Sequence, residues 1–388
     1  MIHAIARCGS TRGALVALAF GALAAVGTSS AIAQQDITRF PAKGVVPPGY
    51  PPQYAAVIAA AEQEGKLVIH STTDLAIASA VVDDFQNLYP RIEVQYQDLN
   101  SSDLYNGYLD DLQTSPTTAD ILWSTAMDLQ LRLANAGQAL AYDSPEASAL
   151  PAWALFRSLA YGTTYEPIAI TYDRRRLADD EVPQSHADVT RLLNEKRQKF
   201  TGRVVTYDIE RSGLGFLLAT QDQKASGAYW DLARALGGVG VRVVPTSEAM
   251  LERVAKGEDL LSYNTLGSYA QREIAARPSL GVVFPQDYTL VVTRVMLIGK
   301  KAANPNAAKL WVDYLLSRRG QTALAERAGL APVRSDLASN NAVASLAKTL
   351  GARGRPIALG SELIDPFPTR EARLAFVRQW QQAVGVRR

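Results

Sequence analysis

The sequence predicts an α/β protein with two lobes, each a mainly parallel sheet flanked by helices. From Gln53 onward, short apolar runs alternate with stretches of helical periodicity, which is typical of β/α units. There are two series of such units. Two long apolar runs, at residues 167–172 and 288–298, stand where the chain would pass from one series to the other. We therefore expect two lobes joined by two hinge strands.

The first series, residues 53–167, is expected to form the first part of lobe 1. Gly65 and Pro90 are stop signals for its first two helices. The expected strands are residues 67–70, 92–96 and 120–123, and the expected helices are residues 54–64, 75–88, 103–112 and 127–135.

A hinge strand at residues 168–172 is expected to lead into lobe 2, residues 173–287. Strands are expected in lobe 2 at residues 203–207, 239–244 and 260–263, and helices at residues 213–221, 228–236, 247–255 and 266–276. Residues 288–388 would supply the return hinge strand and C-terminal helices that pack on lobe 1. Those helices are expected at residues 304–316, 321–328 and 370–384.

Residues 1–33 have the pattern of a cleaved secretory signal. Arg7 and Arg12 precede an apolar run at residues 14–26, and small residues predict cleavage after Ala33. The alternative is a membrane anchor, but the run is shorter than the roughly 20 residues that a spanning helix needs. Residues 34–52 are rich in proline and are expected to form an extended lead-in.

Charge and cysteine content place the mature chain outside the cytoplasm. The chain of 388 residues has 40 Lys and Arg against 38 Asp and Glu, and its single cysteine is Cys8. Removing residues 1–33, which contain two bases and no acid, leaves 38 of each charge and no cysteine. This composition excludes a disulfide scaffold and a basic nucleic-acid coat, and it is compatible with a soluble, monomeric protein of the bacterial periplasm.

Signatures of catalysis and metal binding are missing from the sequence. The mature chain has two histidines, His70 and His186, far apart and with no cysteine to join them, so an ordinary zinc or copper site is not expected. The G-x-S-x-G, H-E-x-x-H and P-loop motifs do not occur. We expect no enzyme and no cofactor.

Polar loops at strand ends are the remaining candidates, because ligands of open α/β sheets bind beyond the carboxyl ends of the strands. In lobe 1 two loops qualify, although helix capping would account for one hydroxyl in each. Their candidate residues are Ser71, Thr72, Thr73, Asp74, Trp123, Ser124 and Thr125.

In lobe 2, Arg211 beside Ser212 and a helix N-terminus would suit an anion. The alternative is a surface arginine paired with Glu210 or Asp208. The candidate residues of lobe 2 are Arg211, Ser212, Gly213, Tyr263, Asn264, Gly267, Asp287 and Tyr288.

Five segments in this order resemble periplasmic solute-binding proteins of ABC importers, in the branch that takes ferric iron, phosphonates and phosphosugars. They are residues 66–71, 120–123, 165–173, 200–203 and 304–311. The Pro-Asn-Ala-Ala-Lys stretch, followed by Leu-Leu-Ser and Gly-Gln, is the most specific part. The resemblance extends over residues 55–333, and the tail from Ser335 is less diagnostic. It implies a class II binding-protein fold, with two lobes that close on a ligand.

One departure bears on the ligand. Ferric-binding members present two adjacent tyrosines where this chain has Tyr263 and Asn264, and none of its 16 tyrosines neighbours another. We therefore predict a small anionic solute, an organic phosphate, phosphonate or carboxylate, held by Arg211 and Ser212. Ferric iron or an iron chelate, with Tyr263, Tyr269 or Tyr288 converging on the metal, is the alternative.

The resemblance also implies the partners of the protein. An inner-membrane ABC permease would receive the solute. Alternatively, the closed form would act as a sensor subunit that engages the periplasmic domain of a histidine kinase.

Overall fold

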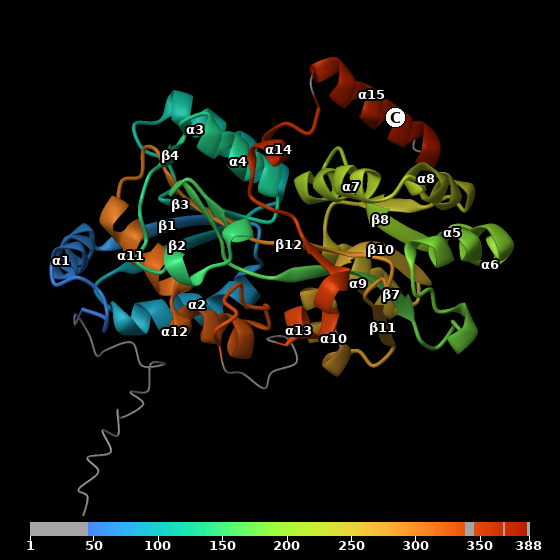
Figure 1. Cartoon of the computed structure of the whole chain (residues 1–388), viewed down its shortest axis with the longest axis horizontal. Helices are drawn as coiled ribbons and strands as arrows, with labels where there is room; N and C mark the ends of the chain where they lie inside the picture. The colour runs from blue at the N-terminus through green and yellow to red at the C-terminus, as the bar shows by residue number, and fades with distance from the viewer. Residues whose placement is uncertain (1–45, 338–344, 368, 386–388) are drawn as a thin grey trace, which may run out of the picture. The chain divides into compact units, whose positions relative to one another are not determined.

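The computed structural model describes residues 46–337, 345–367 and 369–385. In this part of the chain, two sheets of seven strands each form the centres of two lobes (Figure 1). The predicted signal, residues 1–33, lies outside the described residues, as does most of the proline-rich lead-in. None of the described helices is long and apolar enough to cross a lipid bilayer.

The first sheet belongs to lobe 1. Its strand order is β2 (Glu93–Asp98), β1 (Lys66–Ser71), β3 (Ile121–Ser124), β13 (Val295–Gly299), β6 (Ala160–Gly162) and β5 (Leu155–Phe156), with β4 (Ala139–Leu140) beside β13. Strand β1 runs parallel to β2 and β3, whereas β13 runs antiparallel to β3, β4 and β6.

The second sheet belongs to lobe 2. Its strand order is β14 (Gly354–Pro356), β12 (Thr289–Val292), β7 (Glu166–Asp173), β10 (Leu261–Leu266), β8 (Val204–Tyr207) and β9 (Arg242–Val244), with β11 (Leu280–Val283) beside β7. Strand β8 runs parallel to β10 and β9, and β7 runs antiparallel to β10, β11 and β12.

The expected two-lobed α/β architecture is confirmed, but the sheets are mixed and not mainly parallel. The parallel pairs join strands connected through helices, as predicted. The antiparallel pairs come chiefly from β7, β12 and β13, the strands next to the crossings between lobes.

Lobe 1 is covered by helices whose apolar faces meet in one core. Helix α11 packs on α1, and Trp311 contacts Phe85 with ring centres 5.1 Å apart. Helix α1 ends at Gly65, whose φ of 66° suits glycine. The helices are α1 (Tyr54–Glu64), α2 (Leu75–Leu88), α3 (Ser101–Thr114), α4 (Met127–Asn135), α11 (Pro305–Leu316) and α12 (Arg318–Ala323), with short turns η1 (Ala147–Ala149), η2 (Ala152–Ala154) and η4 (Leu324–Ala328).

Lobe 2 has a second core around Phe200, Phe216 and Leu236. Its helices are α5 (His186–Glu195), α6 (Arg197–Phe200), α7 (Gly213–Ala225), α8 (Tyr229–Gly238), α9 (Ser247–Lys256) and α10 (Gly267–Ala276), with the short turn η3 (Asp179–Glu181). Helices α7 and α9 begin at the residues that the sequence predicts, α8 and α10 begin one residue later, and α5 and α6 were not predicted.

The first crossing between the lobes lies at residues 163–165. The chain leaves lobe 1 where β6 ends at Gly162 and enters lobe 2 where β7 begins at Glu166. The expected hinge strand, residues 168–172, is therefore misplaced, since it lies within β7 and pairs with β10 and β11. An apolar run carries no mark of the residue at which the chain changes sheets.

The second crossing divides the run at residues 288–298 into two strands. Strand β12 pairs with β7 of lobe 2, and β13 pairs with β3 of lobe 1. Thr293 and Arg294 lie between them and touch the first crossing. The N–H of Thr163 donates to the carbonyl of Arg294 over 3.0 Å, and the N–H of Arg294 donates to Oγ1 of Thr164 over 2.9 Å. The two crossings therefore form one hinge region.

The C-terminal tail contacts both lobes. Strand β14 extends the second sheet beside β12, helix α14 (Ser361–Ile364) packs on α4 of lobe 1, and helix α15 (Arg370–Val384) packs on α8 of lobe 2 (Figure 1). The remaining elements are α13 (Leu346–Leu350) and η5 (Gly351–Arg353). The expectation that the C-terminal helices pack on lobe 1 holds for α11 and is wrong for α15, because Phe376 and Trp380 join the core of lobe 2.

Candidate functional site

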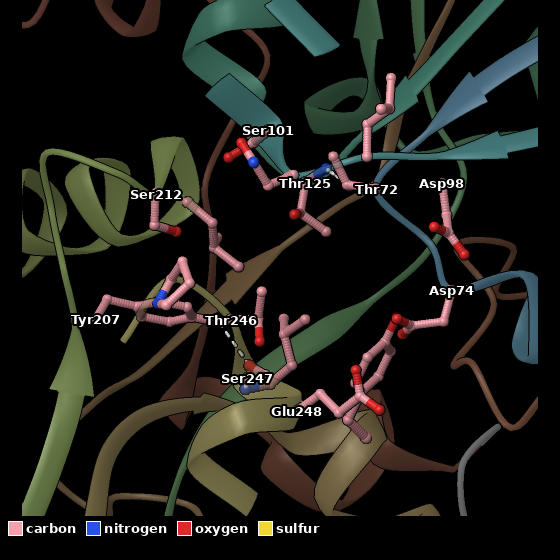
Figure 2. A pocket seen from close by; sticks show the side chains of 16 residues that line it. Thr72, Asp74, Asp98, Ser101, Thr125, Tyr207, Ser212, Thr246, Ser247 and Glu248 are labelled. Carbon is pink, nitrogen blue, oxygen red and sulfur yellow. Dashed lines mark hydrogen bonds between the residues drawn. The ribbon is translucent and has the colours of Figure 1, made fainter. Parts of the chain in front are cut away.

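A pocket of about 230 Å³ lies between the two lobes (Figure 2). Its lining comes from loops that follow the strands of both sheets, where ligands of α/β sheets bind. The residues of lobe 1 in the lining are Thr72, Asp74, Asp98, Leu99, Asn100, Ser101 and Thr125. The residues of lobe 2 are Tyr207, Ser212, Leu214, Pro245, Thr246, Ser247, Glu248, Leu266 and Tyr269.

The loop after β1 is held by its own hydroxyls. Oγ of Ser71 donates to the carbonyl of Trp123 over 2.9 Å and accepts the N–H of Thr73 over 3.0 Å. Oγ1 of Thr72 accepts the N–H of Thr125 over 3.1 Å. Ser71 and Thr73 are fully buried, so of the predicted hydroxyls in this loop only Thr72 faces the pocket.

The loop between β2 and α3 adds a second part of the lobe 1 wall, which the sequence analysis missed. Oδ1 of Asn100 accepts the N–H groups of Ser102 and Asp103, which caps α3. Oδ2 of Asp98 accepts the N–H of Leu75 over 3.1 Å at the start of α2. The loop is recognisable in the sequence, because Asp-Leu-Asn-Ser stands between an alternating strand and a helix.

The wall of lobe 2 is built around Tyr207 and Ser247. Their hydroxyl groups lie 2.5 Å apart, and Oγ of Ser247 also accepts the N–H of Leu266 over 2.9 Å. A Cβ atom on Gly215 would come within 2.5 Å of Cβ of Tyr207. Glycine is therefore needed at this position to let α7 pack against the end of β8.

The two walls meet at Gly213, the first residue of α7. Its N–H donates to Oγ of Ser101 over 2.9 Å, from lobe 2 to lobe 1. A Cβ atom here would lie 2.8 Å from Cδ1 of Leu129 and 3.0 Å from Cβ of Ala126, both in lobe 1. Gly213, predicted as a ligand residue, is thus the place where the lobes approach each other closely.

The charges that line the pocket are negative. Asp74 and Asp98 come from lobe 1 and Glu248 from lobe 2, and no Lys, Arg or His is among the described residues of the lining. In the view of Figure 2 the three carboxylates lie along one side, and Ser212 and Tyr207 lie along the other.

The charge of Asp74 affects the pKa values of two side chains in the lobe 2 wall. Partial burial raises the pKa of Glu248, and the charge of Asp74 is the next largest cause. Burial also raises the pKa of Tyr269. The charge of Arg294 opposes this rise, and the charge of Asp74 and its hydrogen bond to Tyr269 increase it. Asp74 has no capping hydrogen bond to α2, and its side chain instead interacts with the hydroxyl of Tyr269 in the lobe 2 wall.

Several helix-start N–H groups around the pocket are already paired within the protein. The N–H groups of Gly215 and Ala249 donate to the capping side chains of Ser212 and Thr246, just as Asn100 caps α3. These pairs satisfy donors that an anion at a helix start would otherwise use.

Arg211 does not join the predicted site. Its side chain is exposed and outside the pocket lining, and its N–H donates to the carbonyl of Asp208 in the turn before α7. Of the anion site that was predicted around Arg211 and Ser212, only Ser212 lines the pocket.

Tyr263, Asn264 and Tyr288 converge inside lobe 2 and outside the pocket lining. The fully buried Asp222 accepts hydrogen bonds from the hydroxyls of Tyr263 and Tyr288, over 2.7 and 3.0 Å, and from the amide of Asn264 over 2.7 Å. Asn264 has a φ of 68°, a conformation that asparagine adopts more readily than most residues, at a break in the β10 ladder.

Asp287 belongs to the same network. Its Oδ1 lies 2.9 Å from Nδ1 of His186, whose ring stacks on Tyr288 with centres 3.9 Å apart. The side chain of His186 holds the pKa of Asp287 below its usual range, although burial acts in the opposite direction. Residues predicted to face a ligand therefore support the interior of lobe 2.

The other predicted residues also have structural roles. Trp123 is fully buried and donates from Nε1 to Oγ1 of Thr163 over 2.8 Å. Oγ of Ser124 accepts the N–H of Ala126 before α4. Gly267 lies where a Cβ atom would come within 2.4 Å of the Phe284 ring.

The tyrosines named for iron do not meet at one point. Tyr269 lines the pocket, whereas Tyr263 and Tyr288 bind Asp222. No group of three or more His, Cys, Asp or Glu in residues 46–337, 345–367 and 369–385 is arranged to hold a metal ion.

One further segment, residues 245–248, and one further residue, Tyr207, line the pocket and were not predicted as ligand residues. Residues 245–248 follow β9 and begin α9, the same strand-to-helix position that drew attention to the other loops. Tyr207, at the end of β8, lines the pocket although the sequence predicts it only as a strand residue. Its position as the last residue of an apolar strand was the available signal.

Comparison with known proteins agrees with this architecture. Residues 117–350 match the model of a family described as bacterial extracellular solute-binding proteins. The crystal structure of the substrate-binding protein of an ABC transporter from Agrobacterium tumefaciens is similar, with 34% identity and a TM-score of 0.78. The match covers 82% of this chain and 94% of the other. The chain belongs to the bacterial extracellular solute-binding protein family, which confirms the resemblance found in the sequence.

Two more distant structures share the fold. AfuA from Actinobacillus pleuropneumoniae, solved with fructose-6-phosphate, has 17% identity and a TM-score of 0.67 over 83% of this chain and 99% of AfuA. Iron-bound HitA from Pseudomonas aeruginosa has 16% identity and a TM-score of 0.59 over 82% of this chain and 97% of HitA. A search of curated protein sequences gives no match.

Proposed function

We propose that this protein captures a small, positively charged organic solute in the periplasm and delivers it to the permease of an ABC importer. Membership of the extracellular solute-binding family supports capture, and the similar Agrobacterium protein is a substrate-binding protein of an ABC transporter. The predicted signal at residues 1–33 supports the compartment.

The charge of the solute follows from the acidic side of the pocket. Asp74 and Glu248 belong to opposite lobes, and the charge of Asp74 disfavours the ionised form of Glu248. A cation placed between them would be attracted to both lobes. It would thereby favour the arrangement in which the lobes are close, because a ligand shifts an equilibrium only through contacts that differ between its states.

The anionic solute predicted from the sequence has less support. That prediction depended on Arg211, which is outside the pocket lining, whereas the lining carries three carboxylates. An anion would have to approach these carboxylates without a basic side chain from the described lining to offset the repulsion.

A bare ferric ion is also less well supported than an organic cation. Ferric iron is a hard cation that needs several oxygen donors in one coordination shell, and Asp74, Asp98 and Glu248 do not form a cluster that could hold a metal. An amine or guanidinium group is larger and can bind carboxylates that are farther apart.

The remaining lining suits the polar parts of a small solute. Hydroxyl groups of Thr72, Thr125, Ser212 and Thr246 surround the pocket, and hydroxyls both donate and accept hydrogen bonds. The volume of about 230 Å³ is smaller than the roughly 300–1,000 Å³ typical of drug-sized ligands. We therefore expect a compact metabolite.

Thermal unfolding with a panel of solutes tests the proposal. Putrescine, agmatine, choline and arginine represent organic cations, and phosphate, citrate, fructose-6-phosphate and ferric citrate represent the alternatives. A solute at 100 times its Kd stabilises the folded protein by about 2.7 kcal/mol, so we expect a cation to raise the melting temperature. Stabilisation by the anions or the ferric salt alone would exclude a cationic solute and leave the solute-binding role intact.

A further inference from the structure

The side chain of Arg294 lies at the second crossing between the lobes and is fully buried. Its guanidinium group forms an ion pair with Glu166, at the end of the first crossing. Nε lies 2.6 Å from Oε1 of Glu166, and one terminal nitrogen donates to Oε2 over 3.1 Å. The two crossing segments are thus joined by side chains as well as by backbone.

Each member of this ion pair is hydrogen-bonded to a residue that adjoins a wall of the pocket. The other terminal nitrogen of Arg294 donates to Oγ1 of Thr73 in lobe 1 over 2.8 Å. Oε2 of Glu166 accepts the hydroxyl of Ser268, at the start of α10 in lobe 2, over 2.6 Å. Thr73 and Ser268 are completely buried.

The residues next to these contacts line the pocket. Thr72 precedes Thr73, and Tyr269 follows Ser268. The guanidinium carbon of Arg294 also lies 5.2 Å from the centre of the Tyr269 ring, within the range of a cation–π contact. A continuous series of contacts therefore runs from one wall of the pocket, through the hinge region, to the other.

Stability alone is a weak reason for such a pair. Removing two charges from water costs several kcal/mol per ion, and buried ion pairs can often be replaced by apolar residues of similar volume without loss of stability. In some proteins buried polar pairs are retained because they fix the positions of the groups that they join.

We propose that Arg294, together with Glu166, is a positioning residue for solute capture that fixes the two walls of the pocket relative to each other. The proposal rests on the function proposed above, in that the pocket between the lobes is where the solute binds. The ion pair itself does not contact the solute. The pair restricts the relative positions of Thr72 and Tyr269, and hence the range of distances between the lobes.

The distribution of distances between the lobes, measured by pulsed electron paramagnetic resonance without any solute, tests this role. Cys8 is the only cysteine in the sequence. In a Cys8→Ser background, spin labels can be attached at Asp110→Cys in lobe 1 and Arg234→Cys in lobe 2, two exposed positions. We expect one narrow distribution in the parent protein and a broader or displaced one in the Arg294→Met/Glu166→Met double variant.

The double variant removes both charges, so no unpaired charge stays buried and the fold is expected to persist. If it does not fold, Thr73→Val and Ser268→Ala each remove one outer contact and leave the ion pair in place. Each is expected to broaden the distribution in the same direction. The matched control is Arg253→Met/Asp259→Met, which removes an ion pair contained within lobe 2, with Asp259 fully buried. This control should change the melting temperature and leave the distribution unchanged.

Unchanged distributions in folded variants of the Arg294 pair would overturn the proposal. Equal broadening in the Arg253 control would also overturn it, because any loss of a buried pair would then have the same effect. The measurement uses no solute, so its result is independent of whether a cation binds. Failure of the thermal panel and failure of this test are therefore distinguishable.

Discussion

Glu248 and Asp74 show how single residues give the lining of the pocket its negative charge. Neither was predicted to act with the other, since they lie far apart in the sequence and meet only after both sheets have formed. Asp74 was identified as a candidate from its place after β1, and the structure leaves its carboxylate free of a capping role. Glu248 lies in the first turn of α9, where an acidic residue also stabilises the helix dipole.

The raised pKa of Glu248 predicts a pH dependence of solute binding. A cation favours the ionised glutamate, so binding should weaken as pH falls through the pKa of Glu248, which lies above the ordinary value of about 4.3. The stability of the free protein depends on pH in the opposite direction. Because the folded-state pKa is raised, the contribution of Glu248 to stability is lost as pH rises through that window.

Titration calorimetry with the cation selected by the thermal panel, repeated across this pH window, measures the effect. Glu248→Gln should remove the part of the dependence due to this residue. It should also weaken binding by about 1.5–3 kcal/mol if the contact is a charge-assisted hydrogen bond. Glu252→Gln, one turn further along α9 and paired with Lys256, is the matched control. Equal losses in both variants would refute a specific role for Glu248.

Other single residues explain where prediction from sequence stopped. Tyr263 and Tyr288 have the residue types of a ligand site, yet they bind the buried Asp222. Sequence position showed that they lie near strand ends, but it did not show the direction of their side chains. The break in the β10 ladder at Asn264 redirects this segment, and a local bulge of this kind leaves no clear periodic signal.

At the level of elements, three helices of lobe 1 could be predicted closely because each carries a local signal. Helix α1 matches its predicted range and ends at the predicted glycine, and α2 and α4 also match. The hinge positions could not be located, because the apolar runs continue across the change of sheet. A charged residue inside such a run, Arg294, was the one available indication.

The contact between α7 and lobe 1 gives an element-scale prediction. Gly213→Ala would place a Cβ atom against Leu129 and Ala126 and should force the lobes apart. Alanine favours helices by up to about 1 kcal/mol over glycine, so lobe 2 itself should not lose stability. We expect weaker solute binding by calorimetry with little decrease in melting temperature.

Gly107→Ala in α3 is the matched control, because a Cβ atom there meets nothing within 4 Å. It should raise the melting temperature slightly and leave affinity unchanged. If Gly213→Ala binds the solute as well as the parent protein does, the close approach at Gly213 has no part in forming the pocket.

At the scale of the whole molecule, the nearly balanced charge of the chain, 40 Lys and Arg against 38 Asp and Glu, gives no strong overall field that would attract ions of either sign. Selectivity must then come from local groups. The sequence also predicts selectivity through a local group, but the predicted group, Arg211, is positive and lies outside the pocket lining. The folded chain instead brings together Asp74, Asp98 and Glu248 from three separate segments of the chain.

The fold and the family were accessible from sequence because they depend on the order of many elements. The sign of the charge in the pocket lining could not be predicted from the sequence, because it depends on which few side chains face inward. The loops after β2 and β9 show this most clearly, since they have the same polar pattern as the loops that were selected.

The most direct test of the central claim is the identity of the solute that the protein carries when it is produced in bacteria. The protein would be purified from the periplasm without denaturation, the bound solute released by unfolding, and its charge and composition determined by mass spectrometry. We predict a small organic cation with an amine, guanidinium or quaternary ammonium group. Recovery of a phosphorylated or carboxylic anion in stoichiometric amount would contradict the account.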